Sequence, residues 1–333
     1  MADSPLRDGV SSGIAREAEV ATKPVATRSE IAIRGALMKV AEVLTTTAQP
    51  SERIRDRELD FFGLTHPGNV REENQDHFLV CTIHPEVLVH GTSLENIGNL
   101  PLRGERIASL FLVADGVSGG GDGGSEASRI AAESVARYVS STLRSYHAAG
   151  TSDEGTLLQS LTDAALDAHH AVRLGASSHP EGRGMATTLT LGLAVWPWLY
   201  VVQLGDSRSY YCWNGEIRQI TRDQTIAQEL VDQGLLAREK LPASPFKDVL
   251  SSAAGADEAL PEVSRLRVDR NGSVLLFCTD GLTKHVSDDE IAAAIAAHSR
   301  SKDVCESLLK LALDRGGTDN VTIIVARRRQ AAA

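Results

Sequence analysis

Short apolar runs dominate the chain from about residue 58 onward, and polar or glycine-containing turns separate them. Nine runs have the length of a strand: residues 59–64, 77–81, 109–114, 188–195, 199–204, 209–212, 263–268, 274–278 and 321–326. Apolar runs of about four to eight residues between turns are typical of buried strands. The dipeptide Asn214-Gly215 between two later runs also predicts a tight β-hairpin, because both residues tolerate a positive φ.

Helical periodicity appears in two segments in the middle of the chain and again near its end. Apolar residues recur at helical spacing over residues 125–143 and 154–174, and further helices are expected at 225–233, 288–297 and 302–314. Helices grouped between runs of strands differ from the steady alternation of a doubly wound sheet. The order therefore predicts an α+β fold in which helices cover largely antiparallel sheets.

The first 55 residues have a different pattern. Residues 1–28 are small, polar and charged, which predicts a tail without a core of its own. Residues 29–47 carry apolar side chains at helical spacing behind Ser29, a suitable helix cap. A packing or linker helix is the simpler interpretation, and a partner-docking helix is the alternative. We expect a partly disordered segment over 1–55 and one folded domain over 56–329.

The charge balance narrows the classes of partner. The 333 residues include 34 Lys and Arg against 44 Asp and Glu, a formal net charge of −10. This acidity disfavours a non-specific nucleic-acid binder, whereas converging carboxylates would attract divalent cations. The four cysteines are scattered without a C-x-x-C pair, so neither a disulfide framework nor a zinc cluster is expected.

The chain shows no membrane or export signal. No apolar run approaches the ~20 residues of a membrane-spanning helix. The N-terminus is polar and lacks the apolar core of a signal peptide. We therefore expect a soluble cytoplasmic protein, without a membrane span and monomeric.

Aspartates in polar or glycine-rich turns are the candidate chemistry. Four of them lie where strands begin or end: Asp76, Asp115, Asp280 and Asp319. Asp115 and Asp280 each follow an apolar strand and precede a glycine, which permits a sharp turn or a close backbone approach. A single Asp-Gly after a strand is an ordinary turn. The repeated pattern favours a hard divalent cation, Mg²⁺ or Mn²⁺, because such ions prefer oxygen ligands.

Seven motifs follow one another in a recognisable order. They are REENQD at 71–76, DGVSG at 115–119, ATT at 186–188, GDSR at 205–208, ITRDQT at 220–225, TDGL at 279–282 and GGTDNVT at 316–322. With these motifs the sequence resembles the metal-dependent protein phosphatases (the PPM family, type 2C serine/threonine phosphatases) in their bacterial form. The resemblance implies an α-β-β-α sandwich, two antiparallel sheets flanked by helices, with the catalytic domain at 56–329.

The resemblance also implies a site with two metal ions, Mg²⁺ or Mn²⁺, bridged by a water. Asp115 would bridge the two ions, and the carbonyl of Gly116 would bind one of them. Asp280 and Asp319 would complete the shell of one ion, and Asp76 would bind directly or through water. The implied reaction is hydrolysis of phosphoserine and phosphothreonine by an activated water. The implied partners are proteins phosphorylated by a serine/threonine kinase.

Three further positions depend on this resemblance. Arg71 would bind the substrate phosphate through its planar fork; taken alone it would be a surface arginine paired with a neighbouring glutamate. Asp206 is a further candidate ligand, for a weak third ion. Lys284 stands where many members have an aspartate, so we expect it to pair with Asp206 and to weaken that third site.

Residues 227–250 resemble the flap beside the active site, although a plain surface excursion would have the same pattern.

Two other functions remain open at this point. A pseudophosphatase would use the same fold only to hold a partner, and loss of the core aspartates would favour it; all four are present. A metal hydrolase acting on small phosphoesters would also be compatible with the aspartates.

Overall fold

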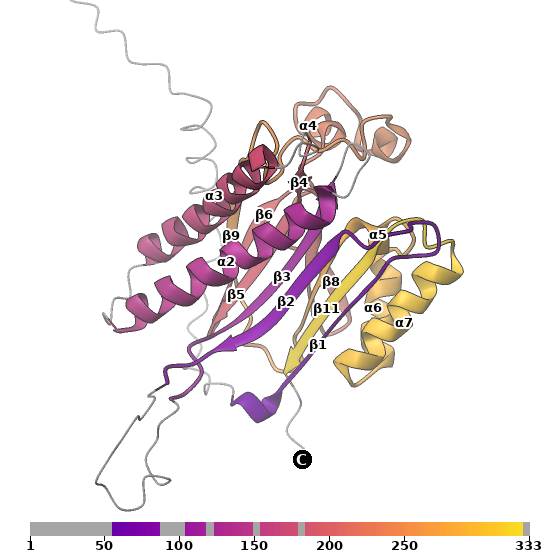
Figure 1. Ribbon diagram of the computed structural model, residues 1–333. Helices are drawn as coiled ribbons and strands as arrows, with labels where there is room; N and C mark the ends of the chain where they lie inside the picture. The colour runs from indigo at the N-terminus through magenta and orange to yellow at the C-terminus, as the bar shows by residue number, and fades with distance from the viewer. Residues whose placement is uncertain (1–54, 87–103, 118–122, 149–153, 179–183, 329–333) are drawn as a thin grey trace, which may run out of the picture. The chain divides into compact units, whose positions relative to one another are not determined.

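The computed structural model describes residues 55–86, 104–117, 123–148, 154–178 and 184–328 (Figure 1). Contacts within the chain divide it after Glu42, and all the described residues belong to the second unit, Val43–Ala333. The helix expected at 29–47 lies outside the described residues, as does the tail before it. All the strands and helices of the described ranges belong to the second unit.

The first sheet contains five antiparallel strands. In spatial order they are β1 (Leu59–His66), β11 (Val321–Arg328), β10 (Val274–Cys278), β7 (Arg208–Trp213) and β8 (Glu216–Gln219). The predicted hairpin joins β7 to β8, and its residues Asn214 and Gly215 have φ values of 52° and 80°. Positive φ at both positions matches the right-handed twist of the two strands.

The second sheet is also antiparallel in all its pairs. Its strands in spatial order are β2 (Asp76–Ile83), β3 (Ala108–Val117), β5 (Leu189–Val195), β6 (Trp198–Leu204) and β9 (Glu262–Arg267). A two-residue strand, β4 (Ala186–Thr187), pairs with the end of β3 beside Gly116. The sequence pattern predicted a strand at 188–195 and did not predict β4.

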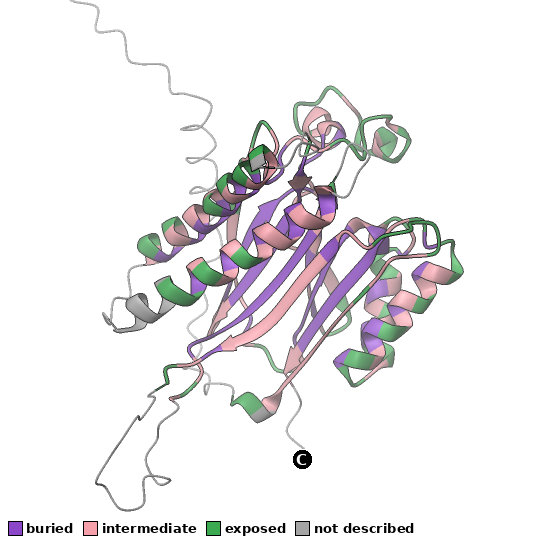
Figure 2. Cartoon of the chain, in the orientation of Figure 1, coloured by how far each residue is buried: buried purple, intermediate pink, exposed green. Residues whose placement is uncertain are grey.

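Helices cover the outer face of each sheet (Figure 1). The second sheet packs against α2 (Gly123–Ala148) and α3 (Glu154–Ser178), and the first against α6 (Asp288–Ala297) and α7 (Ser301–Asp314). In α2 the buried side chains Ala127, Ala131, Val135 and Val139 recur every fourth residue. This stripe faces the sheet while the other side of the helix is exposed, as Figure 2 shows.

A separate apolar layer lies between the two sheets. Phe111 of β3 and Phe277 of β10 stack across it with ring centroids 5.5 Å apart. Gly192 leaves the room for this pair, because a Cβ there would lie 2.2 Å from the Phe277 ring. The predicted α+β sandwich of two antiparallel sheets flanked by helices is therefore confirmed.

The remaining described elements are short: η2 (Asp56–Glu58), α4 (Ile226–Asp232), η4 (Arg238–Ala243) and α5 (Asp280–Thr283). Thr225 begins α4 as expected, since its hydroxyl accepts a hydrogen bond from the Gln228 N–H at 3.2 Å. Within the described ranges, no helix is both long and apolar enough to cross a bilayer.

Candidate metal and phosphate site

Strand ends from both sheets bring the predicted aspartates together. Asp76 at the start of β2 is the register partner of Asp115 near the end of β3. Asp280 begins α5, separated by one residue from the end of β10, and Asp319 lies just before β11; these two strands are neighbours. Asp206 lies in the turn that connects β6 of one sheet to β7 of the other. The charges of the other four all act on Asp115, so the ends of the two sheets form one cluster.

Asp76 is the most deeply buried of these side chains, with 4% of its surface exposed. Its Oδ2 accepts hydrogen bonds from the hydroxyls of Thr279 at 2.8 Å and Thr322 at 2.7 Å. Its Oδ1 is buried and has no hydrogen-bond partner among the described residues. Burial raises the pKa of Asp76 to about 7, since it outweighs the two threonine hydrogen bonds.

Asp115 is held through its main chain. Its N–H donates to the Thr188 hydroxyl at 2.9 Å, and its carbonyl accepts from the Thr187 hydroxyl at 2.9 Å. Burial raises the pKa of the Asp115 carboxyl well above its usual value, and the charges of Asp76 and Asp280 raise it further. This carboxyl therefore lies in a strongly negative environment.

Glycine is required next to Asp115 by the close packing of three chain segments. The Gly116 N–H donates to the Gln75 carbonyl at 3.1 Å. A Cβ on Gly116 would lie 2.2 Å from the Gly124 carbonyl oxygen, closer than any side chain allows. The start of α2 and the end of the 71–76 motif therefore both touch this point of β3.

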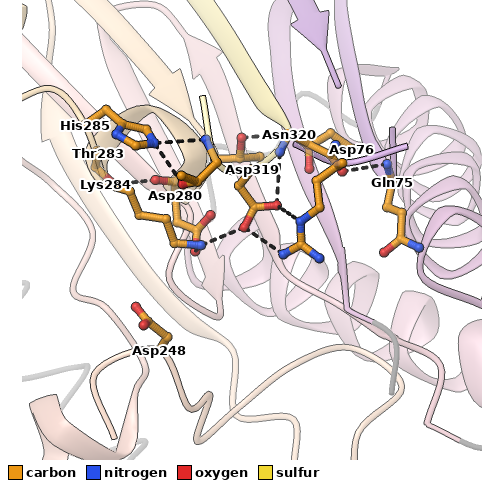
Figure 3. Close-up of polar contacts among 12 residues, drawn as sticks. Gln75, Asp76, Asp248, Asp280, Thr283, Lys284, His285, Asp319 and Asn320 are labelled. Carbon is orange, nitrogen blue, oxygen red and sulfur yellow. Dashed lines mark hydrogen bonds and ion pairs between the residues drawn. The ribbon is translucent and has the colours of Figure 1, made fainter. Parts of the chain in front are cut away.

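Lys284 occupies the space between two of the aspartates. Its Nζ lies 2.6 Å from Asp280 Oδ2 and 2.8 Å from Asp319 Oδ2 (Figure 3). Both carboxylate side chains are 17% exposed, and that of Lys284 is 30% exposed. The spacing of four residues along a helical turn places the ammonium above Asp280, on the side where β11 begins. The expected pairing of Lys284 with Asp206 is therefore wrong.

The pKa values of the two paired aspartates shift in opposite directions. Burial raises the pKa of Asp280, although Lys284 acts against it, and Oδ1 of Asp280 has no hydrogen-bond partner in the described part of the chain. Burial alone would also raise the pKa of Asp319. The hydrogen bonds and charges of Lys284 and Arg71 outweigh it, so the pKa of Asp319 is lowered.

Arg71 also pairs with Asp319. Its Nε lies 2.9 Å from Oδ1, and its terminal nitrogen donates to Oδ2 at 3.1 Å. The Arg71 side chain is 57% exposed, so its guanidinium remains accessible at the edge of the cluster. The alternative pairing with an adjacent glutamate is not what the structure shows.

Asn320 anchors the loop that carries Arg71. Its side-chain amide donates to the carbonyls of Pro67 at 2.9 Å and Glu73 at 2.8 Å, and its Oδ1 accepts from the Gln75 N–H at 2.9 Å. Sequence reasoning placed Asn320 inside the GGTDNVT motif without a role. A buried amide that bonds three backbone groups is a positioning residue, and its only sequence signal is its place after Asp319.

Comparison with known proteins identifies the family of the chain. Residues 102–312, more than half of the chain, match the family described as Protein phosphatase 2C. The chain belongs to the protein phosphatase 2C family. The sequence is 35% identical over 222 residues to the serine/threonine protein phosphatase PstP of Mycobacterium tuberculosis. That match covers 66% of this chain but only 40% of the length of PstP.

Further relatives and solved structures extend the match. The serine/threonine phosphatase Stp of Listeria monocytogenes is 27% identical over 265 residues, covering 79% of this chain and 94% of Stp. A crystal structure of Mycobacterium tuberculosis PstP has a TM-score of 0.65 and 28% identity, covering 82% of this chain and 99% of that one. A PstP catalytic domain in complex with two manganese ions has a TM-score of 0.61 and 27% identity, covering 82% and 99%.

In this protein phosphatase 2C chain, the arginine of the GDSR motif pairs with the aspartate of the ITRDQT motif and not with the aspartate cluster. Arg208 of the GDSR motif donates from Nε to Asp223 at 2.9 Å and from a terminal nitrogen at 2.7 Å. Asp206 lies two residues before Arg208, and burial, together with the charges of Asp280 and Asp223, raises its pKa to about 8. Asp206 therefore belongs to the negative environment of the cluster, to which Asp223 also contributes.

The expected flap contains α4, η4 and exposed apolar side chains. Leu235 is 71% exposed, Phe246 48% and Val249 46%. Asp248 of the same segment lies apart from the hydrogen-bonded residues, on the side of Asp280 and Lys284 (Figure 3). Its charge contributes to the raised pKa of Asp280.

The donor set fits a hard divalent ion on one side of the cluster. Asp76 Oδ1 and Asp280 Oδ1 are buried carboxylate oxygens without a hydrogen-bond partner in the ranges described, and oxygen ligands suit Mg²⁺ and Mn²⁺. The described residues contain no three Asp, Glu, His or Cys side chains that are already close enough to hold an ion together. On the other side, the Lys284 ammonium lies between Asp280 and Asp319.

Proposed function

We propose that this chain is a Mg²⁺- or Mn²⁺-dependent protein phosphatase that hydrolyses phosphoserine and phosphothreonine. The observation that carries the proposal is the pair of buried, unpartnered oxygens, Asp76 Oδ1 and Asp280 Oδ1, in the described structure. Burying a carboxylate without a partner is costly, and a bound cation would remove that cost. Family membership, and relatives that are named serine/threonine phosphatases, support the substrate class.

In this proposal, Asp76, Asp115, Asp280 and Asp319 hold the ions, together with the carbonyl of Gly116. Asp206 is an outer candidate. When bound, such ions supply Lewis acidity and a water that ionises near neutral pH. The Thr279 hydroxyl fixes the Asp76 carboxylate, and the Thr188 hydroxyl fixes the main chain of Asp115, before substrate arrives.

Arg71 binds the substrate phosphate. The guanidinium is exposed and already presents two nitrogens to the Asp319 carboxylate, the same fork geometry that suits two phosphate oxygens. Asn320 keeps the Arg71 loop against the start of β11. The reaction is a direct attack of water on phosphorus, without a covalent enzyme intermediate.

The catalytic domain of this proposal covers residues 56–329, and residues 1–55 lie outside it. The substrates would be proteins phosphorylated by a serine/threonine kinase, which family membership supports. We expect the protein to act as a monomer in the cytoplasm. Sedimentation of the purified chain tests the first expectation, and fractionation of cells tests the second.

A binding module without catalysis is the alternative that one observation favours. Lys284 already pairs with Asp280 and Asp319 without a metal, so the fold could persist as a pseudophosphatase. Turnover of p-nitrophenyl phosphate and of a phosphothreonine peptide, with Mn²⁺ and with EDTA, separates the alternatives. Metal-dependent turnover that is more efficient on the peptide supports the proposal. No turnover of either compound would leave the binding module, and preference for small phosphoesters would change the substrate class.

A further inference from the structure

Lys284 divides the aspartate cluster into two halves. We call Asp76, Asp115 and Oδ1 of Asp280 the open half, because two of its oxygens have no hydrogen-bond partner in the described residues. We call Oδ2 of Asp280 and the whole of Asp319 the closed half, because cationic side chains of the protein already bind them.

Every acceptor position of Asp319 in the closed half is used. Oδ1 lies 2.9 Å from Arg71 Nε and accepts from the Asn320 N–H at 3.0 Å. Oδ2 accepts from Arg71 at 3.1 Å and from Lys284 Nζ at 2.8 Å. A carboxylate has about four lone-pair sites, so a metal ion can bind Asp319 only after a donor leaves.

The position of Lys284 is fixed by its surroundings. Its backbone N–H donates to the Asp280 carbonyl at 2.8 Å, which closes the single turn of α5. Leu282 and Val286 on either side of it are buried, at 0% and 2% exposure. The turn therefore fixes the backbone of Lys284 beside the two carboxylates, and its tethered ammonium competes there at a high effective concentration.

We propose that Lys284 is a tethered cation in the position of one of the two metal ions. The protein then binds one divalent ion tightly in the open half and admits a second only by displacing the ammonium from Asp280 and Asp319. This inference rests on the proposed function for the nature of the ions, but its test does not require turnover.

The test is Mn²⁺ binding to the metal-free full chain. Isothermal titration calorimetry measures the binding, and electron paramagnetic resonance measures the Mn²⁺ that remains free. We expect the wild type to bind one Mn²⁺ tightly and the second at least about tenfold more weakly. Lys284→Met keeps the length of the side chain and removes its charge, so the second dissociation constant should fall at least about tenfold. Lys284→Arg keeps a cation in place and should resemble the wild type.

Lys310→Met is the matched control, because it removes one positive charge from an exposed pair with Asp314 on α7. It should leave both dissociation constants within about twofold of the wild type. Far-ultraviolet circular dichroism checks the fold of each variant, and Lys284→Gln replaces Lys284→Met if that variant fails to fold. Equal Mn²⁺ binding by the wild type and the uncharged variants, or no binding by any of them, would overturn the inference. Mn²⁺ binding as expected but without phosphatase turnover would overturn only the proposed function.

Discussion

The open and closed halves of the cluster use the same residue type in opposite ways. In the open half, Asp76 and Asp115 have raised pKa values because burial and the charges of neighbouring aspartates disfavour their charged forms. In the closed half, the pKa of Asp319 is lowered because Lys284 and Arg71 outweigh its burial. The open half needs a cation from solution, whereas in the closed half the protein supplies the cations through its own side chains.

The difference between the two halves shows that the partner of an aspartate in a family motif depends on its surroundings as well as on the motif. Asp280 belongs to both halves, with Oδ2 on Lys284 and Oδ1 buried without a partner in the described structure. The free energy of a buried carboxylate depends on every charge that faces it. The number of ions held here is therefore set by one lysine outside the aspartate motifs.

The largest expected effect comes from a change inside the open half. Asp115→Asn keeps the shape of the side chain but removes the charge that faces both Asp76 and Asp280. We expect kcat to fall at least about a hundredfold, because metal-assisted catalysis supplies several kcal/mol of barrier lowering. Steady-state turnover of a phosphothreonine peptide measures it.

Asp314→Asn on the surface of α7 is the control for Asp115→Asn, since Asp314 pairs only with exposed Lys310 among the ion pairs described. It should leave kcat unchanged. If Asp115→Asn retains more than about a tenth of the wild-type kcat, a barrier change below ~1.4 kcal/mol, Asp115 is not a metal-bridging residue.

The stability of the metal-free protein should depend on pH through the raised carboxyl groups. Asp76 has a pKa of about 7 and Asp206 of about 8 in the folded protein, against an ordinary value of 3.8. The folded state therefore binds these protons more tightly, and their stabilising contribution is lost as pH rises through about 7 to 8. We expect the free energy of unfolding in EDTA to fall by a few kcal/mol between about pH 5 and pH 8.

Urea unfolding at the two pH values measures this loss, and Mn²⁺ should restore stability at the higher pH. Asp76→Asn removes one of the titrating groups, so the metal-free variant should depend less on pH. Equal stability of the metal-free wild type at both pH values would mean that the carboxylates of the cluster do not destabilise the fold when they ionise. The contrast between the open and closed halves would then be wrong.

The sequence predicted the layers and most of this site because both depend on local patterns. Strand-length apolar runs and helical periodicity predicted an α+β fold with antiparallel sheets, and the resemblance to the PPM family predicted the sandwich. Asp-Gly after a strand identified Asp115 and Asp280. The partner of Lys284 was not predictable, since it depends on how β11 meets α5 in three dimensions. Asn320 and Thr322 were also missed as site residues, because one amide and one hydroxyl have no periodic signal.

Thr322 gives a smaller test of how the open half is positioned. Its hydroxyl donates to Asp76 Oδ2 at 2.7 Å and lies 2.8 Å from the Thr65 hydroxyl, one step farther from the cluster. Thr322→Val keeps the shape and removes a hydrogen bond to a buried carboxylate, so it should lower the free energy of unfolding by about 1–3 kcal/mol. Thr65→Val is the matched control and should cost less. Equal losses in thermal or urea unfolding would show that the bond to Asp76 is not special.

The smallest effect is expected at the exposed edge of the closed half. Arg71 is 57% exposed, so its pair with Asp319 is weakened by solvent. Arg71→Ala removes a phosphate contact, and the KM for a phosphothreonine peptide should rise about tenfold while kcat stays within about threefold. Arg71→Lys keeps the charge without the planar fork and should be intermediate. In Arg71→Ala the Lys284 ammonium still lies between Asp280 and Asp319, where the second ion would bind. The Mn²⁺ dissociation constants of Arg71→Ala should therefore stay within about twofold of the wild type, unlike those of Lys284→Met. An increase in Mn²⁺ affinity as large as that of Lys284→Met would mean that Arg71, and not the lysine alone, closes this half; an unchanged KM would mean that Arg71 serves only as the ion-pair partner of Asp319.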